Sequence, residues 1–592
     1  MSHNIFASMR ARVVQALHGV VPDLPEEVVA RVEVTPAREP EHGDMATNAA
    51  LVVAKAARRK PQDIAAALVA VLQADPLVAE AAVAGPGFVN LRLHADAWRR
   101  LLPVILRTGE AYGDSTAGAG VRINVEYVSA NPTGPMHIGH CRGAVVGDAL
   151  ANLLAKVGHE VTKEFYVNDA GNQVTALAWA AYFRYLQALE VSITEADFSE
   201  IVPGGLQYRG DYLIPVGQAL AAQFGASLLS ADSWIGEPET WLIDVRDFTI
   251  AMMLEQITDD LAALGVVHDV FVRERDLVEQ GEVHEAIARL ELDGLVYRGT
   301  LEPPKGKTID DWEPREQMLF RATAFGDDVD RPLQKSDGSF TYFANDIAYH
   351  AHKIARGFDL MIDVWGADHG GYVKRMQAAT RAFGGTLDVV LCQIVHVLKG
   401  GQPLRMSKRA GTFITLRDLL DEVGPDAVRF TMLTRKSDAQ MEFDIDQAVA
   451  QTRENPVFYV QYAHARCRSV LRAAGELLGA AAVAPESLAQ VPLDSLENEA
   501  ELALLRRLGA WPRTVEAAAA AREPHRIAFF LYDLAGDFHM LWNRGRDDSA
   551  LRFLQADRPA ETLARVALVA ATAVAIRSGL AVMGVTPVEE MR

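Results

Sequence analysis

Two histidines with two residues between them stand in the stretch SANPTGPMHIGHCRG, residues 129–143. Imidazole N–H groups donate hydrogen bonds to phosphate oxygens, and their charge can follow the charge that develops during phosphoryl chemistry. Gly139, between His137 and His140, leaves room for a flat ring such as adenine to approach the backbone. Since G-x-x-x-x-G-K-[ST] is absent, the stretch predicts a nucleoside triphosphate site without a Walker loop. A surface histidine pair, or a metal pair lacking a third ligand, is the alternative.

A second candidate segment is PLRMSKRAGTF, residues 403–413, in which Met406, Ser407 and Lys408 follow a Gly-Gly turn. Pyrophosphate leaves with several negative charges that must be stabilised together, and a basic segment suits that task. The two segments together predict nucleotide activation chemistry.

These residues need elements that bring them together. From residue 121 the pattern runs strand, turn, helix, strand, and similar units return after residue 340, which predicts a doubly wound parallel sheet. In such a sheet, ligands bind beyond the carboxyl ends of the strands, where a helix N-terminus presents free N–H groups. We expect His137 and His140 in the first turn of such a helix.

The chain divides into four expected regions. They are an N-terminal α/β module over 1–115, a catalytic domain over 116–400 with an insertion at about 190–290, a connecting region over 401–454, and an all-α domain over 455–592. In the first region VAGPGFVNLRL alternates like a strand, and Pro61 interrupts a helical pattern.

Composition narrows the class of protein. The chain has 49% hydrophobic and 23% charged residues, and no window approaches the ~18 consecutive apolar residues of a membrane span, so we expect a cytoplasmic protein with no membrane partner. The three cysteines lie far apart, which predicts reduced thiols and no zinc site. The net charge of -20 argues against a nucleic-acid partner, but local basic stretches at 55–60, 405–409 and 464–472 leave RNA binding open.

The pairing of H-I-G-H after the first strand with M-S-K late in the sheet resembles class I aminoacyl-tRNA synthetases. Within that class, the sequence resembles the bacterial arginyl-tRNA synthetase family over almost the whole chain. The segments that carry the resemblance are VEYVSANPTGPMHIGH, FYVNDAGNQ, YFANDIAYH, WGADHGGY, MSKRAGTF, YVQYAHARC and GVTPVEEM. Arg405 and Arg409 stand where the general K-M-S-K-S signature has its first lysine and last serine, so the role of Arg405 stays open.

The resemblance implies a fold, an activity and a set of partners. The fold is an α/β multidomain one, with a Rossmann-type catalytic domain, an N-terminal module for the tRNA elbow and a C-terminal all-α anticodon-binding domain. The activity is ATP-dependent attachment of L-arginine to tRNA(Arg) through arginyl-adenylate. The resemblance also implies ATP with Mg²⁺, no zinc, and a monomer that needs bound tRNA before it activates arginine.

Residue types agree with that substrate, because a planar guanidinium is best held by carboxylates such as Glu126 and Asp346. The family's sites fall on three sets of residues. For arginine they are Glu126, Ser129, Asn131, His140, Tyr342, Asp346 and His369; for ATP they are His137, Gly139, His140, Gly366, Asp368, Met406, Ser407 and Lys408; for tRNA they are Phe88, Asn90, Tyr459, Tyr462, Arg466 and Arg468. We expect His137, His140 and Lys408 to be the catalytic residues.

Two other readings of the sequence stay open. One is another ligase of the same class, although the cysteine spacing disfavours a zinc-dependent member and the insertion is short for a large editing domain. The other is a catalytically silent relative that only binds RNA. Such a protein need not keep His137, His140, Lys408, Glu126 and Asp346 together.

Overall fold

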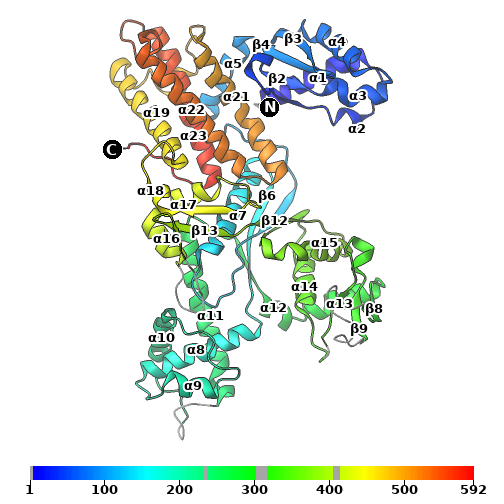
Figure 1. Ribbon diagram of the computed structural model, residues 1–592, viewed down its shortest axis with the longest axis vertical. Helices are drawn as coiled ribbons and strands as arrows, with labels where there is room; N and C mark the ends of the chain where they lie inside the picture. Colours follow the sequence, from blue (N-terminus) through cyan, green and yellow to red (C-terminus); the bar gives the residue numbers. More distant parts are fainter. Residues whose placement is uncertain (1–3, 231–236, 302–315, 336, 405–413, 592) are drawn as a thin grey trace. The chain divides into compact units, whose positions relative to one another are not determined.

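A computed structural model describes residues 4–230, 237–301, 316–335, 337–404 and 414–591 (Figure 1). The chain forms two compact units, the sheet unit and the terminal unit. The sheet unit comprises Gly120–Ala151 and His159–Val449, and the terminal unit comprises Met1–Ala119, Asn152–Gly158 and Ala450–Arg592.

A five-stranded parallel sheet forms the centre of the sheet unit. Its strand order is β12-β11-β5-β6-β7, so the strand order reverses between β5 and β11. The strands are β5 (Arg122–Glu126), β6 (Glu160–Val167), β7 (Val270–Arg273), β11 (Leu360–Gly366) and β12 (Leu387–Cys392). The predicted doubly wound parallel sheet is confirmed, and its ligand crevice is expected outside the carboxyl ends of β5 and β11.

Helices that border this crevice follow from local sequence. Helix α7 (Ile138–Lys156) comes after β5, and a Cβ added at Gly147 would lie 2.3 Å from Tyr127 Cγ, so glycine lets α7 approach the strand end. Helix α14 (Tyr342–Ala355) precedes β11 and is capped by the Thr341 hydroxyl, which accepts from the Ala344 amide. The chain then continues through α15 (Val373–Ala382).

Two groups of elements interrupt the parallel sheet. Between β6 and β7 lie α8 (Asn172–Ala188), α9 (Glu195–Ile201), α10 (Ile214–Phe224) and α11 (Pro238–Ala263), which pack around their own apolar core. Between β7 and β11 come α12 (Glu274–Glu279), α13 (Glu282–Leu292), β8 (Val296–Gly299), β9 (Gln317–Phe320) and β10 (Arg331–Pro332), the last three forming an antiparallel sheet, and then α14. The insertion predicted at about 190–290 therefore takes in β7, a strand of the central sheet.

A small sheet of order β14-β13-β15 completes the sheet unit. It contains β13 (Val395–Lys399), β14 (Gln402–Pro403) and β15 (Met441–Asp444), and is accompanied by α16 (Leu416–Val423), α17 (Pro425–Met432) and α18 (Ile445–Val449). The segment TLDVVLCQIVHVLKGG contributes β12 to the parallel sheet and β13 to this one, because the chain changes sheets at Gln393 and Ile394.

The terminal unit begins with an antiparallel sheet of order β1-β2-β4-β3 packed on helices. Its elements are α1 (Ile5–Val20), α2 (Glu26–Val29), β1 (Val34–Pro36), β2 (Met45–Thr47), α3 (Ala49–Ala57), α4 (Pro61–Leu72), β3 (Val78–Ala84) and β4 (Phe88–Leu93). The stretch VAGPGFVNLRL is a hairpin rather than one strand, because Gly85 (φ +51°) and Gly87 (φ +142°) turn the chain. Pro61 opens α4, where a missing N–H costs nothing.

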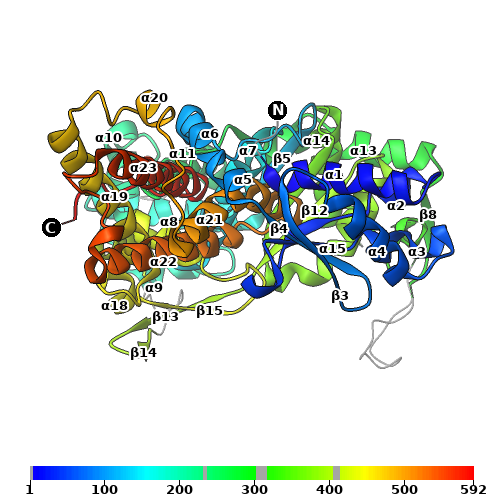
Figure 2. The same ribbon diagram turned by 90° about the horizontal axis from the view of Figure 1, so that it is seen from above.

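A helical bundle forms the rest of this unit (Figure 2). Its helices are α5 (Ala95–Arg99), α6 (Leu101–Thr108), α19 (Pro456–Leu478), α20 (Pro485–Leu488), α21 (Glu499–Ala521), α22 (His525–Asp547) and α23 (Pro559–Met583). Helix α23 is long and apolar enough to cross a membrane, but 89% of its most apolar window is buried among its neighbours, as in a core helix. The Trp511 indole N–H donates to the Tyr112 carbonyl at 2.9 Å, which ties the bundle to the segment that follows α6.

Candidate functional site

His137 and His140 stack on each other at the start of α7, with ring centroids 3.9 Å apart. The Gly139 amide donates to His137 Nδ1 at 3.1 Å, and the His137 amide donates to His140 Nδ1 at 3.4 Å. Because both Nδ1 atoms accept from the backbone, both neutral imidazoles carry their proton on Nε2. The backbone of the turn therefore sets both rings to donate through Nε2.

Gly139 has a structural reason beyond the one expected from the sequence. A Cβ at this position would lie 2.8 Å from His137 Cε1, so a side chain would displace the ring. Gly139 is exposed, and the two histidines are half-buried.

The described chain after the M-S-K segment contacts the H-I-G-H turn. Thr415, which caps α16, forms a β-bridge with His137, and the Leu416 amide donates to the Met136 carbonyl at 2.8 Å. The ATP-site residues predicted within the M-S-K segment, Met406, Ser407 and Lys408, and also Arg405 and Arg409, lie outside the described residues.

The chain between β5 and α7 has an unusual backbone. Val128 and Ser129 have φ values of +70° and +39°, a region that side chains with a Cβ rarely adopt. The Ser129 hydroxyl donates to Glu126 Oε1 at 2.8 Å and accepts from the Tyr166 amide at 3.0 Å. This strained turn therefore fixes the Glu126 carboxylate between β5 and β6.

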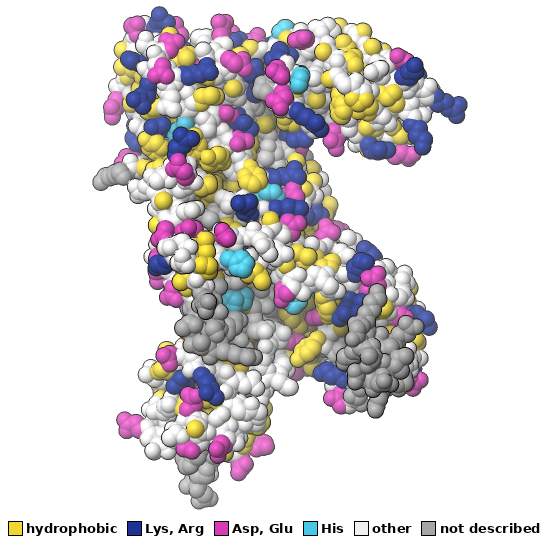
Figure 3. Space-filling model, in the orientation of Figure 1, with side chains coloured by type: hydrophobic (Ala, Val, Ile, Leu, Met, Phe, Trp, Pro, Cys, Tyr) yellow, Lys and Arg dark blue, Asp and Glu magenta, His cyan; other side chains and the backbone are white. Residues whose placement is uncertain are grey.

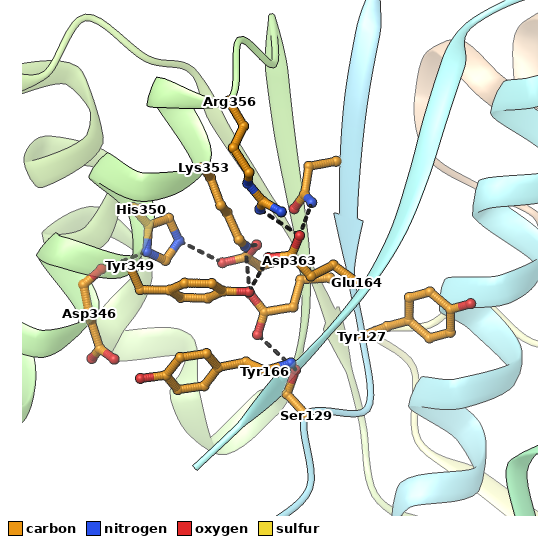
Figure 4. Close-up of polar contacts among 12 residues, drawn as sticks. Tyr127, Ser129, Glu164, Tyr166, Asp346, Tyr349, His350, Lys353, Arg356 and Asp363 are labelled. Atoms are coloured by element: carbon orange, nitrogen blue, oxygen red, sulfur yellow. Dashed lines mark hydrogen bonds and ion pairs between the residues drawn. The ribbon is translucent and has the colours of Figure 1, made fainter. Parts of the chain in front are cut away.

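Lys353 is fully buried and forms ion pairs with two carboxylates beside this turn (Figure 4). Its Nζ lies 2.5 Å from Glu126 Oε2 and 3.0 Å from Asp363 Oδ1. Burial opposes the charge on Lys353, but Asp363, Glu126 and Glu164 together raise its pKa. Burial likewise opposes the charge on Asp363, yet Lys353 and His350 lower the pKa of this carboxyl to about 2.

His350 donates from both ring nitrogens in this network. Nε2 lies 2.9 Å from Asp363 Oδ2, and Nδ1 lies 2.8 Å from the Asp346 carbonyl. Both partners are acceptors, so the ring is held as the imidazolium, in accord with a pKa raised by Asp363 against the effect of burial.

The charge of Glu164 on β6 is also balanced by a cation. It accepts from the Tyr349 hydroxyl at 2.6 Å, from Arg356 at 2.5 Å and from the Asn124 amide at 2.9 Å. The buried network thus holds three carboxylates, Glu126, Asp363 and Glu164, and three cations, Lys353, His350 and Arg356, so its charges cancel.

Two further carboxylates, Asp346 and Glu274, are not balanced by a cation of this network. Neither forms an ion pair with a cation in the part of the chain that the structure describes; Asp346 accepts from the Tyr372 hydroxyl at 2.5 Å, and Glu274 Oε1 accepts from the Asn345 amide at 2.9 Å. Burial raises the pKa of both carboxyls; Asp346 and Asp169 raise that of Glu274 further, and Asp363 that of Asp346.

Tyr166 points its hydroxyl toward Asp346, with its ring stacked on Tyr349 at 4.2 Å (Figure 4). Among the described residues, this buried hydroxyl and Glu274 Oε2 have no hydrogen-bond partner. Burial raises the pKa of the Tyr166 hydroxyl, and Glu274, Asp346, Glu126 and Asp169 raise it further, so these carboxylates all act on one point. Unsatisfied buried acceptors around one hydroxyl form a site for a cation that donates hydrogen bonds.

Sequence reasoning missed Tyr166, Glu274 and Lys353. Tyr166 lies near the carboxyl end of β6, and Glu274 directly follows β7, so both stand at the sheet edge where ligands are expected. Counting polar residues at every strand end would have found these two. Lys353 gave no such signal, because a lysine near the end of a helix is ordinarily exposed.

The other predicted arginine-site residues lie in varied surroundings. Asn131 is exposed, and its amide donates to Gln173 Oε1 at 3.0 Å. Tyr342 opens α14 and is 65% exposed, whereas Asp346, one turn later, is partly buried.

His369 lies in a 3₁₀ turn after β11 and not on the strand; it is exposed, and its Nε2 is 3.6 Å from Asp368 Oδ2. Gly366 ends β11 directly before that turn.

Two of the predicted tRNA-site residues lie on the N-terminal sheet. Phe88 and Asn90 are both on β4, and the Phe88 side chain is 39% exposed. Lys and Arg side chains gather at the end of this module that carries α2 and α3 (Figure 3).

The remaining predicted tRNA-site residues lie on α19. Tyr459, Tyr462 and Arg466 line a pocket of about 570 Å³ together with His539 of α22. The Arg466 guanidinium lies 4.1 Å from the Tyr462 ring centroid and 4.7 Å from that of Trp542, so two aromatic faces hold the cation. Arg468 does not line this pocket; its Nε is 2.6 Å from Glu589 Oε2.

Groups of three or more His, Cys, Asp or Glu side chains suited to a metal ion do not occur among the described residues. All three cysteines are buried and free.

Comparisons with known proteins agree along the whole chain. Residues 7–93 match the family described as arginyl tRNA synthetase N terminal domain, residues 102–198 and 312–466 match tRNA synthetases class I (R), catalytic domain, and residues 460–591 match DALR anticodon binding domain. An arginine–tRNA ligase of Gluconobacter oxydans is 61% identical over 591 residues, 99% of this chain and 98% of that protein. One of Ruegeria pomeroyi is 54% identical, with 100% of both chains covered.

A solved structure of Thermus thermophilus arginyl-tRNA synthetase superposes with a TM-score of 0.73, covering 99% of this chain and 100% of that one. At 23% sequence identity this similarity bears on the fold alone. It agrees with the multidomain architecture expected from the sequence.

Proposed function

Because the chain belongs to the arginyl-tRNA synthetase family and is an arginine–tRNA ligase, which attaches arginine to tRNA in translation, we propose specific roles for its site residues. His137, His140 and Lys408 stabilise the phosphates of ATP, and the carboxylates around Tyr166 bind the arginine side chain. The observation that carries the first assignment is the histidine stack, in which backbone amides donate to both Nδ1 atoms and so make Nε2 the protonated, donating nitrogen of each ring.

The ATP site follows from this stack and from the sheet. The histidines donate to the triphosphate at the N-terminus of α7, where backbone N–H groups also favour an anion. Gly139 admits the adenine, Gly366 and Asp368 lie near the ribose, and Met406, Ser407 and Lys408 act on the leaving pyrophosphate. The contact of Thr415 with His137 supports the last assignment, because the chain after the M-S-K segment resumes beside the histidines. Mg²⁺ would be bound chiefly by the phosphates of ATP, where it would offset part of their negative charge.

The arginine site is built from the carboxylates that lack a cation. Asp346 and Glu274, which both act on the Tyr166 hydroxyl, pair with the guanidinium. The charge of Glu126 is already balanced by Lys353, so Glu126 holds the Ser129 turn beside this site. Ser129, Asn131, His140, Tyr342 and His369 then contact the rest of the amino acid, as their places in the family imply.

The chemistry needs positioning and electrostatic stabilisation rather than a covalent enzyme intermediate. The arginine carboxylate attacks the α-phosphate of ATP, pyrophosphate departs, and arginyl-adenylate forms. A hydroxyl of the terminal adenosine of the tRNA then attacks the activated carbonyl, and AMP leaves. His137, His140 and Lys408 stabilise the charge that develops on the phosphates during the first step.

The remaining assignments concern tRNA and the state of the protein. The module over 1–115 contacts the tRNA elbow through Phe88 and Asn90, and the domain over 455–592 contacts the anticodon through Tyr459, Tyr462, Arg466 and Arg468. The pocket of Tyr462 and Arg466 supports this, since aromatic and guanidinium planes stack on splayed bases. The catalytic domain spans 116–400 with its insertion, and 401–454 connects it to the helical domain. The enzyme works as a cytoplasmic monomer without zinc or a membrane.

The first step can be tested in isolation. Single-turnover formation of arginyl-adenylate, with tRNA present, is compared between the unaltered enzyme, His140→Ala and Lys408→Ala. We expect a loss of at least about 100-fold in rate for both variants, because each removes a donor to developing charge. Lys399→Ala, which removes an exposed lysine paired with Glu422, is the matched control. Unchanged adenylate formation in Lys408→Ala with a folded protein would contradict the assignment.

A further inference from the structure

Arg142 is a buried cation that the mechanism above does not use. It lies on α7, two residues after His140, and is 1% exposed. Its guanidinium donates only to backbone carbonyls: Nη1 to Gln393 at 3.1 Å and to Ala439 at 2.7 Å, and Nη2 to Lys436 at 2.8 Å. No carboxylate forms an ion pair with it in the part of the chain that the structure describes. Burial lowers the pKa of this arginine, because the interior disfavours its charged form.

The three carbonyls share one place in the fold. Gln393 lies two residues before β13, and Lys436 and Ala439 lie five and two residues before β15. The parallel strands β13 and β15 begin side by side, with Val395 opposite Met441. The planar guanidinium of Arg142 therefore forms hydrogen bonds to the segments that lead into both strands. Lysine could not do this, because it lacks the fixed fork of N–H donors.

In the small sheet β14-β13-β15, which Arg142 contacts through the segments that lead into β13 and β15, strands β13 and β14 directly precede the M-S-K segment in the chain. Strand β13 pairs with β14, and Leu404, one residue after β14, is the last described residue before that segment. On the far side of the segment, Thr415 bridges to His137. Both flanks of the segment are thus tied to the start of α7, one by Arg142 through the sheet and one by the bridge.

We propose that Arg142 is a positioning residue that sets the small sheet β14-β13-β15, and with it the approach to the M-S-K segment, at the correct distance from His137 and His140. This inference rests on the proposed role of Lys408. A displacement of about 1 Å at a reacting group can cost on the order of 100-fold in rate, so the effect of Arg142 falls on the rate of the chemical step. The initial binding of ATP changes little.

The test is a double-mutant cycle between Arg142→Lys and Lys408→Ala. With the unaltered Lys408, we expect Arg142→Lys to slow adenylate formation by about 10- to 100-fold, while the KM for ATP changes less than about 2-fold. In the Lys408→Ala background the same substitution is expected to cost less than about 3-fold, because the group it positions is gone. Transfer of arginine to tRNA from arginyl-adenylate that is synthesised chemically and supplied to the enzyme is expected to stay within about 2-fold.

The control is Arg565→Lys, which alters another buried arginine, paired with Glu501 in the terminal unit at 2.7 Å. Its effect on adenylate formation is expected to be small and the same in both backgrounds. If Arg142→Lys does not fold, Arg142→Gln serves instead, since its side-chain amide buries no charge and can still donate to a backbone carbonyl.

The outcomes separate the two proposals. Losses from Arg142→Lys and Lys408→Ala that multiply, or an equal loss in adenylate formation and in transfer, would overturn the positioning role and leave a purely structural one. Lys408→Ala without effect on its own would instead overturn the proposed function of the M-S-K segment.

Discussion

Replacing Glu274 by glutamine tests whether the carboxylates around Tyr166 bind the arginine side chain. Glu274 Oε1 accepts from the Asn345 amide, and the glutamine carbonyl can keep that bond. The other oxygen, Oε2, has no partner among the described residues, and glutamine places an NH₂ group there. The substitution therefore leaves the packing intact and turns the free acceptor into a donor that opposes a guanidinium.

The expected loss follows from burial. Glu274 is only 4% exposed, so water screens its charge weakly. Losing one charged partner of a buried pair costs about 2–4 kcal/mol, which corresponds to an increase of about 30- to 700-fold in the KM for arginine. The KM for ATP is expected to change less than about 2-fold, because the histidine turn is untouched.

Although Glu274→Gln is expected to bind arginine more weakly, its fold is expected to be at least as stable as that of the unaltered enzyme. Burial, Asp346 and Asp169 raise the folded-state pKa of Glu274, against the Asn345 hydrogen bond, so ionisation near neutral pH destabilises the fold. This penalty is absent below the ordinary pKa of a glutamate and is present in full above the raised one. Glu274→Gln should therefore unfold at an equal or higher temperature than the unaltered enzyme at pH 7.5.

The assay is steady-state aminoacylation with arginine and ATP varied in turn, together with thermal unfolding. Glu282→Gln is the matched control, since its carboxylate contacts His352 and is not among the carboxylates that act on Tyr166. An unchanged KM for arginine, or equal increases for arginine and ATP, would refute the assignment of Glu274. A lower unfolding temperature would refute the electrostatic reasoning.

Four further outcomes are expected. The KM for arginine should rise as pH falls through the raised pKa values of Glu274 and Asp346, and this rise should be shallower in Glu274→Gln; parallel profiles would count against two titrating carboxylates. Asn90→Ala should raise the KM for tRNA at least several-fold and leave that for ATP unchanged; equal changes would argue against a tRNA contact. Lys353→Met should lower the free energy of unfolding by about 3–5 kcal/mol in denaturant titrations, because it leaves Glu126 and Asp363 buried without their cation. The stabilisation from Asp363 should fade as pH drops from about 4 toward 2 in the unaltered enzyme but much less in that variant.

Local sequence signals predicted the elements that carry the site. The strand, turn and helix around H-I-G-H were predicted from apolar periodicity and turn residues, and the parallel sheet followed from their alternation. Periodicity could not tell that LDVVLC and VHVLK join different sheets, because both read as buried strands and the change of sheet depends on tertiary pairing. It also read the hairpin around Gly85 and Gly87 as one strand.

Residue type alone marked His137, His140 and Asp346 as candidates, because imidazoles suit phosphates and a carboxylate suits a guanidinium, and their roles stay predictions. The balance of charge could not be predicted from the sequence, because it depends on which cation contacts which carboxylate. Lys353 comes from the helix before β11 and crosses to Glu126 on β5, a contact between residues 227 positions apart. Only the folded structure shows that Glu126 is already neutralised and that Glu274 is not.

The central claim is that this enzyme selects arginine for activation by binding its guanidinium group. The most direct test is exchange of labelled pyrophosphate into ATP, driven by each of a panel of amino acids that includes lysine and citrulline, with and without bulk bacterial tRNA. We predict exchange with arginine alone, in the presence of tRNA, and none with citrulline, which has the same shape but no charge. Exchange with citrulline or lysine at rates near that of arginine, or no exchange with arginine at all, would contradict the account.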